Sequence, residues 1–156
     1  MSVAPPFDGS ALVYRTGGGT YVKDYYNEWV VPPAELLTTE MVKWLSKSGP
    51  FGAAVDGQST APHRFALETS ITAIYGDFQD PRHPRVVFEA HVYLLDDGSD
   101  RREVAYQNQY DITIPLEGAS ARHLVLGAGR AYRELLKSIE RDLSAHRETL
   151  VAANTD

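Results

Sequence analysis

The stretch VVFEAHVYL, residues 86–94, decides the fold because it alternates apolar and polar side chains. Successive side chains of an extended strand point to opposite faces, so this alternation predicts a strand with one buried and one solvated face. The predicted buried side consists of Val86, Phe88, Ala90, Val92 and Leu94, and the predicted polar side of Glu89, His91 and Tyr93. We therefore expect a sheet that is covered on one side only.

Two further runs, residues 65–75 and 104–114, show the same alternation. Their predicted buried residues are Phe65, Leu67, Ile71, Ala73 and Tyr75 in the first run, and Val104, Tyr106, Tyr110, Ile112 and Ile114 in the second. The loop 76–84 and the short turn 96–100 would connect the runs as hairpins. The sequence thus predicts an antiparallel meander whose open face carries Glu68, Ser70, Thr72, Glu89, His91, Gln107 and Gln109.

The N-terminal part predicts two more strands and a tight turn. ALVYR (11–15) and TYVKDYY (20–26) are β-prone, and the glycines of residues 16–19 allow the positive φ values that a tight connection needs. Further along the chain, FGAAV (51–55) predicts a short buried strand.

Two helices are predicted around this sheet. Pro32 and Pro33 suit a first helical turn, because the N–H that proline lacks would be unpaired there. The stripe that follows is Leu37, Met41, Trp44, Leu45 and Ser48, and Gly49-Pro50 ends the helix. The second helix begins near Ser120, and its stripe is Leu124, Ala128, Ala131, Leu135, Ile139 and Leu143. Gly127 and Gly129 each weaken it by roughly 1 kcal/mol relative to alanine, unless close packing uses the missing side chain.

Together these elements predict an α/β fold, α+β in character, in a single domain. A mixed, mainly antiparallel sheet of about five to six strands would carry two long helices packed on it. We expect the domain to span residues 1–145 and residues 146–156 to form a frayed tail.

Composition excludes several classes of protein. The formal net charge is −6, whereas a nucleic-acid-binding protein is expected to show a basic face, so no nucleic acid is predicted as a partner. The absence of cysteine excludes disulfides, thiol catalysis and cysteine-ligated zinc for the chain as given. No apolar run approaches the roughly 18 residues of a membrane span, so we expect the chain as given to be soluble.

No motif for catalysis, cofactor or metal stands out. TGGGT (16–20) lacks the spacing and lysine of a phosphate loop, and DDGSD (96–100) lacks the ligand spacing of an EF-hand, so both are interpreted as turns. His91 with Glu89 and Glu68 is the only acid–base cluster that can be built, and we interpret it as a solvated polar patch. We predict no catalytic, cofactor-binding or metal-binding residue, and no cofactor.

The aromatic residues of the N-terminal third are divided between core and surface. Trp29 and Trp44 are expected to pack between hairpin, helix and sheet, because a tryptophan buries a large area in typical cores. Tyr25 and Tyr26 are adjacent, so in a regular strand they would face opposite sides and only one could enter the core. The candidates for contact with a partner or a lipid acyl chain are Tyr21, Asp24, Tyr25 and Tyr26.

The order of several segments resembles the ABC-type transport auxiliary lipoprotein family. The chain shows LVYR with a glycine-bearing turn, YVKDYYNEWVVPP, a helix ending in KWLSKSGPF, then ITAIYGDF and a terminal helix containing DL. The resemblance runs from about Phe7 to Leu143. It implies a periplasm-facing lipoprotein, anchored in the Gram-negative outer membrane by an N-terminal lipidated cysteine. This chain has no such cysteine, so we expect the leader to have been removed; the alternative is a soluble relative without a membrane anchor.

The family accompanies MCE-type (mammalian cell entry) intermembrane lipid transporters, the paraquat-inducible system among them, and supplies no catalytic residues. The leading hypothesis is a non-enzymatic accessory component that docks on a transport partner near the outer membrane. Its partners would be an MCE-domain protein and ABC transporter components, with lipid and a second copy of the chain as further candidates. The alternative is a soluble protein that binds lipid or a small ligand in a pocket under the helices. An uncharacterised hydrolase ranks third.

Overall fold

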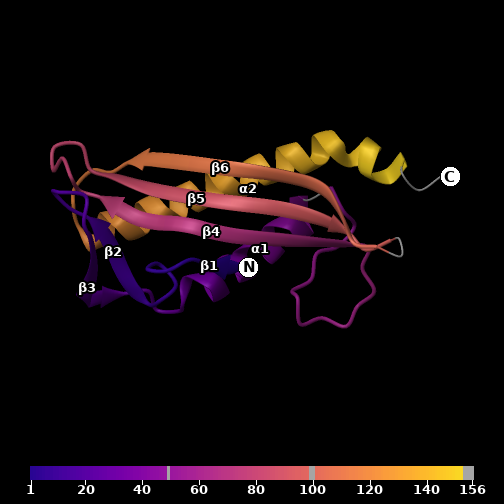
Figure 1. The fold of residues 1–156 in the computed structure, drawn as a ribbon, viewed down its shortest axis with the longest axis horizontal. Coiled ribbons are helices and arrows are strands. Elements are labelled where there is room, and N and C mark those ends of the chain that lie inside the picture. The colour runs from indigo at the N-terminus through magenta and orange to yellow at the C-terminus, as the bar shows by residue number, and fades with distance from the viewer. Residues whose placement is uncertain (49, 99–100, 153–156) are drawn as a thin grey trace.

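The computed structural model describes residues 1–48, 50–98 and 101–152, with side chains up to residue 146 in the last helix. Within these residues six strands and two helices follow one another along the chain (Figure 1). In chain order they are β1 (Ser2–Val3), β2 (Ala11–Arg15), β3 (Tyr21–Glu28), α1 (Pro33–Ser48), β4 (Phe65–Asp77), β5 (Arg85–Asp96), β6 (Glu103–Pro115) and α2 (Ala121–Ala152).

All six strands belong to one mixed sheet. Its order is β3-β2-β4-β5-β6, and β1 pairs with β4 beside β2. The long strands β4, β5 and β6 are antiparallel neighbours, as the alternating runs predicted, whereas β1 and β2 both run parallel to β4. The predicted hairpin is formed by β2 and β3, and Gly18 and Gly19 adopt positive φ in its turn. The predicted fold class, a single α+β domain, is confirmed.

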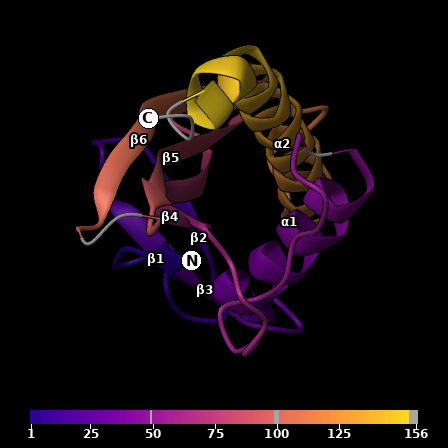
Figure 2. The same ribbon diagram turned by 90° about the vertical axis from the view of Figure 1, so that its right-hand side faces the viewer.

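Both helices cover the same face of the sheet, as the view along the strands in Figure 2 shows. On this face Phe88 of β5 packs against Tyr132 of α2, with ring centroids 5.8 Å apart. The Thr69 hydroxyl of β4 donates a hydrogen bond to the Met41 sulfur of α1 at 3.7 Å. The predicted stripe residues Leu37, Met41 and Leu45 of α1, and all six of α2, are buried. Burial of these two apolar stripes against one sheet face is what assembles the domain.

The opposite face is open, as predicted. Among the seven polar residues expected there, Glu68, Gln107 and Gln109 are exposed, and the remaining four are half-buried. None lies beneath a third layer of the described chain.

Two strands were in part predicted wrongly. In β6, Val104 was expected to be buried but is 56% exposed, because a register shift places it opposite Leu95. In β4, the faces change because the strand contains a bulge at Thr72. The register passes from Ile71, opposite Ala90, to Ala73, opposite Glu89, so the residues after Thr72 change faces. Ile74 therefore lies opposite Phe88 on the helix side, whereas Ala73 and Tyr75 turn to the open side. Tyr75 is still buried, because the Phe7 ring stacks on it with centroids 5.8 Å apart.

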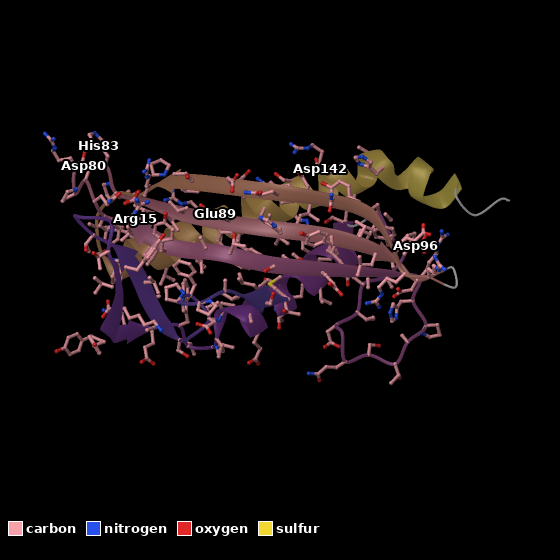
Figure 3. All side chains as sticks on the ribbon, viewed as in Figure 1. Arg15, Asp80, His83, Glu89, Asp96 and Asp142 are labelled. Atoms are coloured by element: carbon pink, nitrogen blue, oxygen red, sulfur yellow. The ribbon has the colours of Figure 1, made fainter. Side chains whose placement is uncertain are left out.

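A polar network fastens the second half of α2 to β6. The Asp142 carboxylate, labelled in Figure 3, accepts hydrogen bonds from the hydroxyl of Tyr110 (2.9 Å) and more weakly from Tyr106 and Asn108 (both 3.3 Å). Arg141 donates to its other oxygen at 3.0 Å. Burial raises the pKa of Asp142, but these hydrogen bonds outweigh it, and the net pKa is lowered.

Close packing explains one of the two helix glycines. A Cβ on Gly127 would lie 2.2 Å from Leu116 Cδ2 and 3.2 Å from Val86 Cγ1. A side chain at position 127 would therefore require the Leu116 side chain, which follows β6, or the helix to shift. Gly129 has no such neighbour, since a Cβ there would meet nothing within 4 Å.

Two further sequence expectations concern chain segments outside the main elements. The predicted strand 51–55 is wrong: no strand occurs among the described residues between α1 and β4, and Val55 is half exposed. This short apolar run has no neighbouring strand to supply hydrogen bonds. Helix α2 continues to Ala152, so it includes much of the segment expected as a tail, and residues 153–156 lie outside the described residues.

Candidate functional site: a tyrosine bulge and an interhelical groove

The edge strand β3 carries a large irregularity in the middle of the candidate contact region. Its register with β2 passes from Lys23, opposite Val13, to Glu28, opposite Ala11. Residues 24–27 therefore stand opposite Leu12 alone and leave the regular ladder. We call these four residues, Asp-Tyr-Tyr-Asn, the tyrosine bulge.

The Asp24 carboxylate holds the bulge together. One oxygen accepts hydrogen bonds from the backbone N–H groups of Tyr26 (2.8 Å) and Asn27 (3.1 Å). The other accepts from the Tyr14 hydroxyl (2.7 Å) and the Asn27 side chain (2.9 Å). The Tyr26 backbone bond, followed by the bonds from Tyr14 and Asn27, lowers the pKa of Asp24 to about 2. Asp24 thus acts as a support for the bulge and stays charged at neutral pH.

Both tyrosines of the bulge point away from the protein. Tyr25 is 91% exposed and Tyr26 is 95% exposed, so the expectation that one of them enters the core is wrong. The reason is the bulge, since the alternation of a regular strand no longer applies to residues 24–27. Exposed tyrosines on a fixed backbone are typical anchors of protein interfaces, because they offer a large contact area with few rotatable bonds.

Tyr21, the remaining candidate, has a different environment. Its ring packs edge-on against Phe7 (5.5 Å between centroids) and Tyr75 (5.1 Å) on the open face of the sheet. It remains 44% exposed. The structure therefore separates Tyr21, which helps cover Tyr75, from the two tyrosines that make no such ring contact.

A groove lies between the two helices near their N-terminal halves. Its volume is about 410 Å3. The walls come from the loop before α1, from α1 and from α2, with Ile74 of β4 at the base. Most lining side chains are apolar, and they include Trp29, Leu36, Trp44, Val125 and Leu136. Leu36 and Val125 are 40% and 42% exposed, so the groove opens to solvent along an apolar margin.

The polar groups of the groove are mostly engaged within the protein. The Trp44 indole N–H donates to Glu140 at 2.7 Å, and Glu40 forms an ion pair with Lys43 at 2.8 Å. The Tyr132 hydroxyl donates to the carbonyl of Leu37 and joins α2 to α1. Burial raises the pKa of Tyr132, so this phenol stays protonated at neutral pH. Arg133 differs, since it forms no ion pair or hydrogen bond with any other residue that the structure describes.

The two tryptophans lie at this groove. Each is half-buried and packs against the core without being enclosed by it. The prediction that both pack between the elements is thus correct in part, because neither is fully buried. The groove was not predicted. Leu36 and Val125 are apolar residues outside the predicted stripes, and they could have signalled it.

The polar patch of His91, Glu89 and Glu68 on the open face forms no acid–base cluster. Glu89 lies opposite Asp111, His91 opposite Gln109, and Glu68 opposite Tyr93, and no hydrogen bond or ion pair among the described residues joins the three. Figure 3 shows Glu89 on this face of the sheet.

The two described carboxylates of the DDGSD segment, Asp96 and Asp97, have arginine partners. Asp96 accepts two hydrogen bonds from Arg64 (2.9 and 2.7 Å), and Asp97 accepts two from Arg102 (2.6 and 2.9 Å). Residues 99 and 100 lie outside the described residues. Across the described chain, no three His, Asp or Glu side chains are placed to hold a metal ion.

Comparison with known proteins identifies the family. The sequence profile of the ABC-type transport auxiliary lipoprotein component matches residues 1–140. The chain belongs to this family. The resemblance in segment order is therefore confirmed. Membership in this auxiliary lipoprotein family implies a place in the cell envelope and association with ABC transport components, and it is consistent with a non-enzymatic accessory role.

Solved structures share the fold of this auxiliary lipoprotein. A protein from Xanthomonas campestris matches with a TM-score of 0.81 and 15% identity, over 96% of this chain and 84% of that one. An uncharacterized protein matches with a TM-score of 0.77 and 21% identity, over 92% and 87%. A putative lipoprotein from Caulobacter crescentus gives 0.50 and 13%, over 85% and 88%. None of the curated proteins compared with the sequence matches it. Among the described helices, none has the length and apolarity to cross a membrane.

Proposed function

We propose that this auxiliary lipoprotein is a non-enzymatic component of an MCE-type intermembrane lipid transport system in the Gram-negative envelope. It docks on the MCE-domain partner near the outer membrane, where an N-terminal lipid would hold it. Family membership supports the accessory role, and the tyrosine bulge is the observation that carries the docking proposal.

The bulge has three properties that suit a docking surface. Its two tyrosines are almost fully exposed, its backbone is fixed by the Asp24 carboxylate, and it belongs to an edge strand of the sheet. A fixed backbone reduces the entropy lost when a partner binds. Tyrosine anchors of this kind account for much of the binding energy in measured interfaces.

Co-purification with the MCE-domain protein tests this proposal. Tyr25→Ser combined with Tyr26→Ser removes both rings but leaves Asp24 and its hydrogen bonds in place, so stability should change little. We expect association to fall about 10-fold or more, in line with the loss of interface anchors. Reversal of the neighbouring exposed charge, Lys23→Glu, should also weaken association.

The matched control lies on the open face of the sheet. His91→Ala combined with Glu89→Gln should leave association and envelope function nearly intact. Unchanged association of the tyrosine variant would refute docking through the bulge. If the control variant lost function while it folded, localised and bound its partner normally, an enzymatic activity would have to replace the accessory role.

The groove favours a second candidate function, the binding of a lipid or small ligand under the helices. Its volume lies within the roughly 300–1,000 Å3 that is typical of ligand pockets, and its lining is mainly apolar. Binding of this kind does not require the tyrosine bulge, so both functions can belong to one protein.

A further inference from the structure

We propose that the interhelical groove binds the single alkyl chain of an anionic amphiphile and that Arg133 pairs with its charged head. A fatty acid and a lysophospholipid share this chemistry. The inference rests on the second candidate function and names its ligand class. Its test uses the purified chain alone, so its failure can be distinguished from a failure of docking on the MCE-domain partner.

The shape and lining of the groove fit an alkyl chain. Apolar side chains of α1 and α2 face each other across it, and Ile74 of the sheet closes its base. Leu36 and Val125 remain about two-fifths exposed at its margin, so an alkyl chain placed between the helices would remove apolar surface from water. A volume of about 410 Å3 leaves room for one chain segment of modest length.

Gly129 indicates that this open space is a built feature of α2. A glycine in a helix interior costs roughly 1 kcal/mol relative to alanine. At Gly127 the contact with Leu116 and Val86 explains that cost, but a Cβ on Gly129 would meet nothing within 4 Å. Gly129 lines the groove, so the missing side chain deepens the groove at the expense of helix stability.

The charges around the groove select the head group. Arg133 follows Gly129 by one helical turn and lines the groove. The other charged lining residue, Glu40, is already paired with Lys43, and the neighbouring Glu134 is paired with Lys137. Arg133 is thus the lining cation without a described partner, and a guanidinium binds carboxylate or phosphate oxygens through paired hydrogen bonds.

Intrinsic fluorescence can measure binding at this site directly. The chain contains two tryptophans, Trp29 and Trp44, and both line the groove. We would titrate the protein with dodecanoate and with lauroyl lysophosphatidic acid below their micelle concentrations. Dodecanol and dodecyltrimethylammonium serve as neutral and cationic controls with the same chain. A saturable spectral change with an anion, at least about 10-fold tighter than with either control, is the expected result. The anion with the higher affinity then identifies the preferred head group as carboxylate or phosphate.

Two variants distinguish the binding of the alkyl chain in the groove from the binding of the charged head at Arg133. Gly129→Leu places a side chain in the groove and should abolish binding of both anions, while the helix is stabilised. Arg133→Gln should weaken both anions about 10-fold and leave dodecanol unchanged.

Four results would overturn the proposal. These are no saturable change with either anion, equal affinity for the neutral or cationic control, full binding by Gly129→Leu, or unchanged anion affinity in Arg133→Gln. Self-association of the native chain that Gly129→Leu abolishes, without anion binding, would assign the groove to a second copy instead.

Discussion

Replacement of the two glycines of α2 by alanine tests how this helix meets the sheet. Both substitutions add the same Cβ to the same helix, two positions apart, so each gains the same helix propensity of about 1 kcal/mol. Only Gly127 is in close contact, since its Cβ would lie 2.2 Å from Leu116 Cδ2. Either the buried Leu116 side chain or the helix has to shift, and overpacking of this kind costs about 1–3 kcal/mol.

Gly129→Ala should therefore raise the free energy of unfolding, whereas Gly127→Ala should leave it unchanged or lower it. We expect Gly129→Ala to stabilise by up to about 1 kcal/mol, because nothing within 4 Å opposes the new methyl group. Gly127→Ala should range from nearly neutral to a loss of about 2 kcal/mol, so the difference between the variants, about 1–3 kcal/mol, isolates the packing cost.

Urea unfolding followed by circular dichroism measures both values under identical conditions. The native protein and the two variants should unfold with the same denaturant slope and different midpoints. Equal midpoints for Gly127→Ala and Gly129→Ala would refute the close contact of Gly127 with Leu116.

Further predictions concern the polar network, the bulge and the groove. Asp142→Ala removes the shared acceptor of Tyr106, Tyr110 and Asn108 and should cost about 1–3 kcal/mol in urea unfolding; no measurable change would show that the network does not fasten α2 to β6. Because the pKa of Asp24 is lowered to about 2 from 3.8, its contribution to the bulge is complete above pH 3.8 and is lost as the pH falls through 2. The NMR chemical shift of the Tyr26 amide should therefore change with a midpoint near pH 2, as Asp24 is protonated. A midpoint near 3.8 would contradict the hydrogen bonds to Asp24. Trp29→Ala should cost less than the roughly 3–5 kcal/mol of a fully buried tryptophan, because it widens an open groove; a loss within that range would place Trp29 in the core.

The main strands were predictable from sequence because their signal is local. In β5, Val86, Phe88, Ala90, Val92 and Leu94 are all buried on the helix side, as the alternation requires. Tyr75 is buried as predicted but lies on the other face, because the bulge at Thr72 changes the faces while the sequence keeps alternating. Its burial comes from Phe7 and Tyr21, which lie far away in the sequence.

The candidate sites depend still more on tertiary contacts. Asp24 and Asn27 are residue types that hydrogen-bond nearby backbone, and they could have signalled the tyrosine bulge. The extent of the bulge follows from the register between β3 and β2, and the sequence pattern does not define this register. The groove depends on how far apart α1 and α2 lie, a distance that neither helical stripe determines alone.

Site-specific photo-crosslinking tests the proposed docking most directly. A photoreactive phenylalanine analogue would replace Tyr25 in the lipoprotein expressed in its own envelope, and His91 on the open face would serve as the control position. Both residues reach solvent, but only Tyr25 belongs to the bulge. The account predicts a crosslink to the MCE-domain protein from position 25 and none from position 91. A crosslink to that protein from position 91 alone, or from neither position in functional cells, would contradict it.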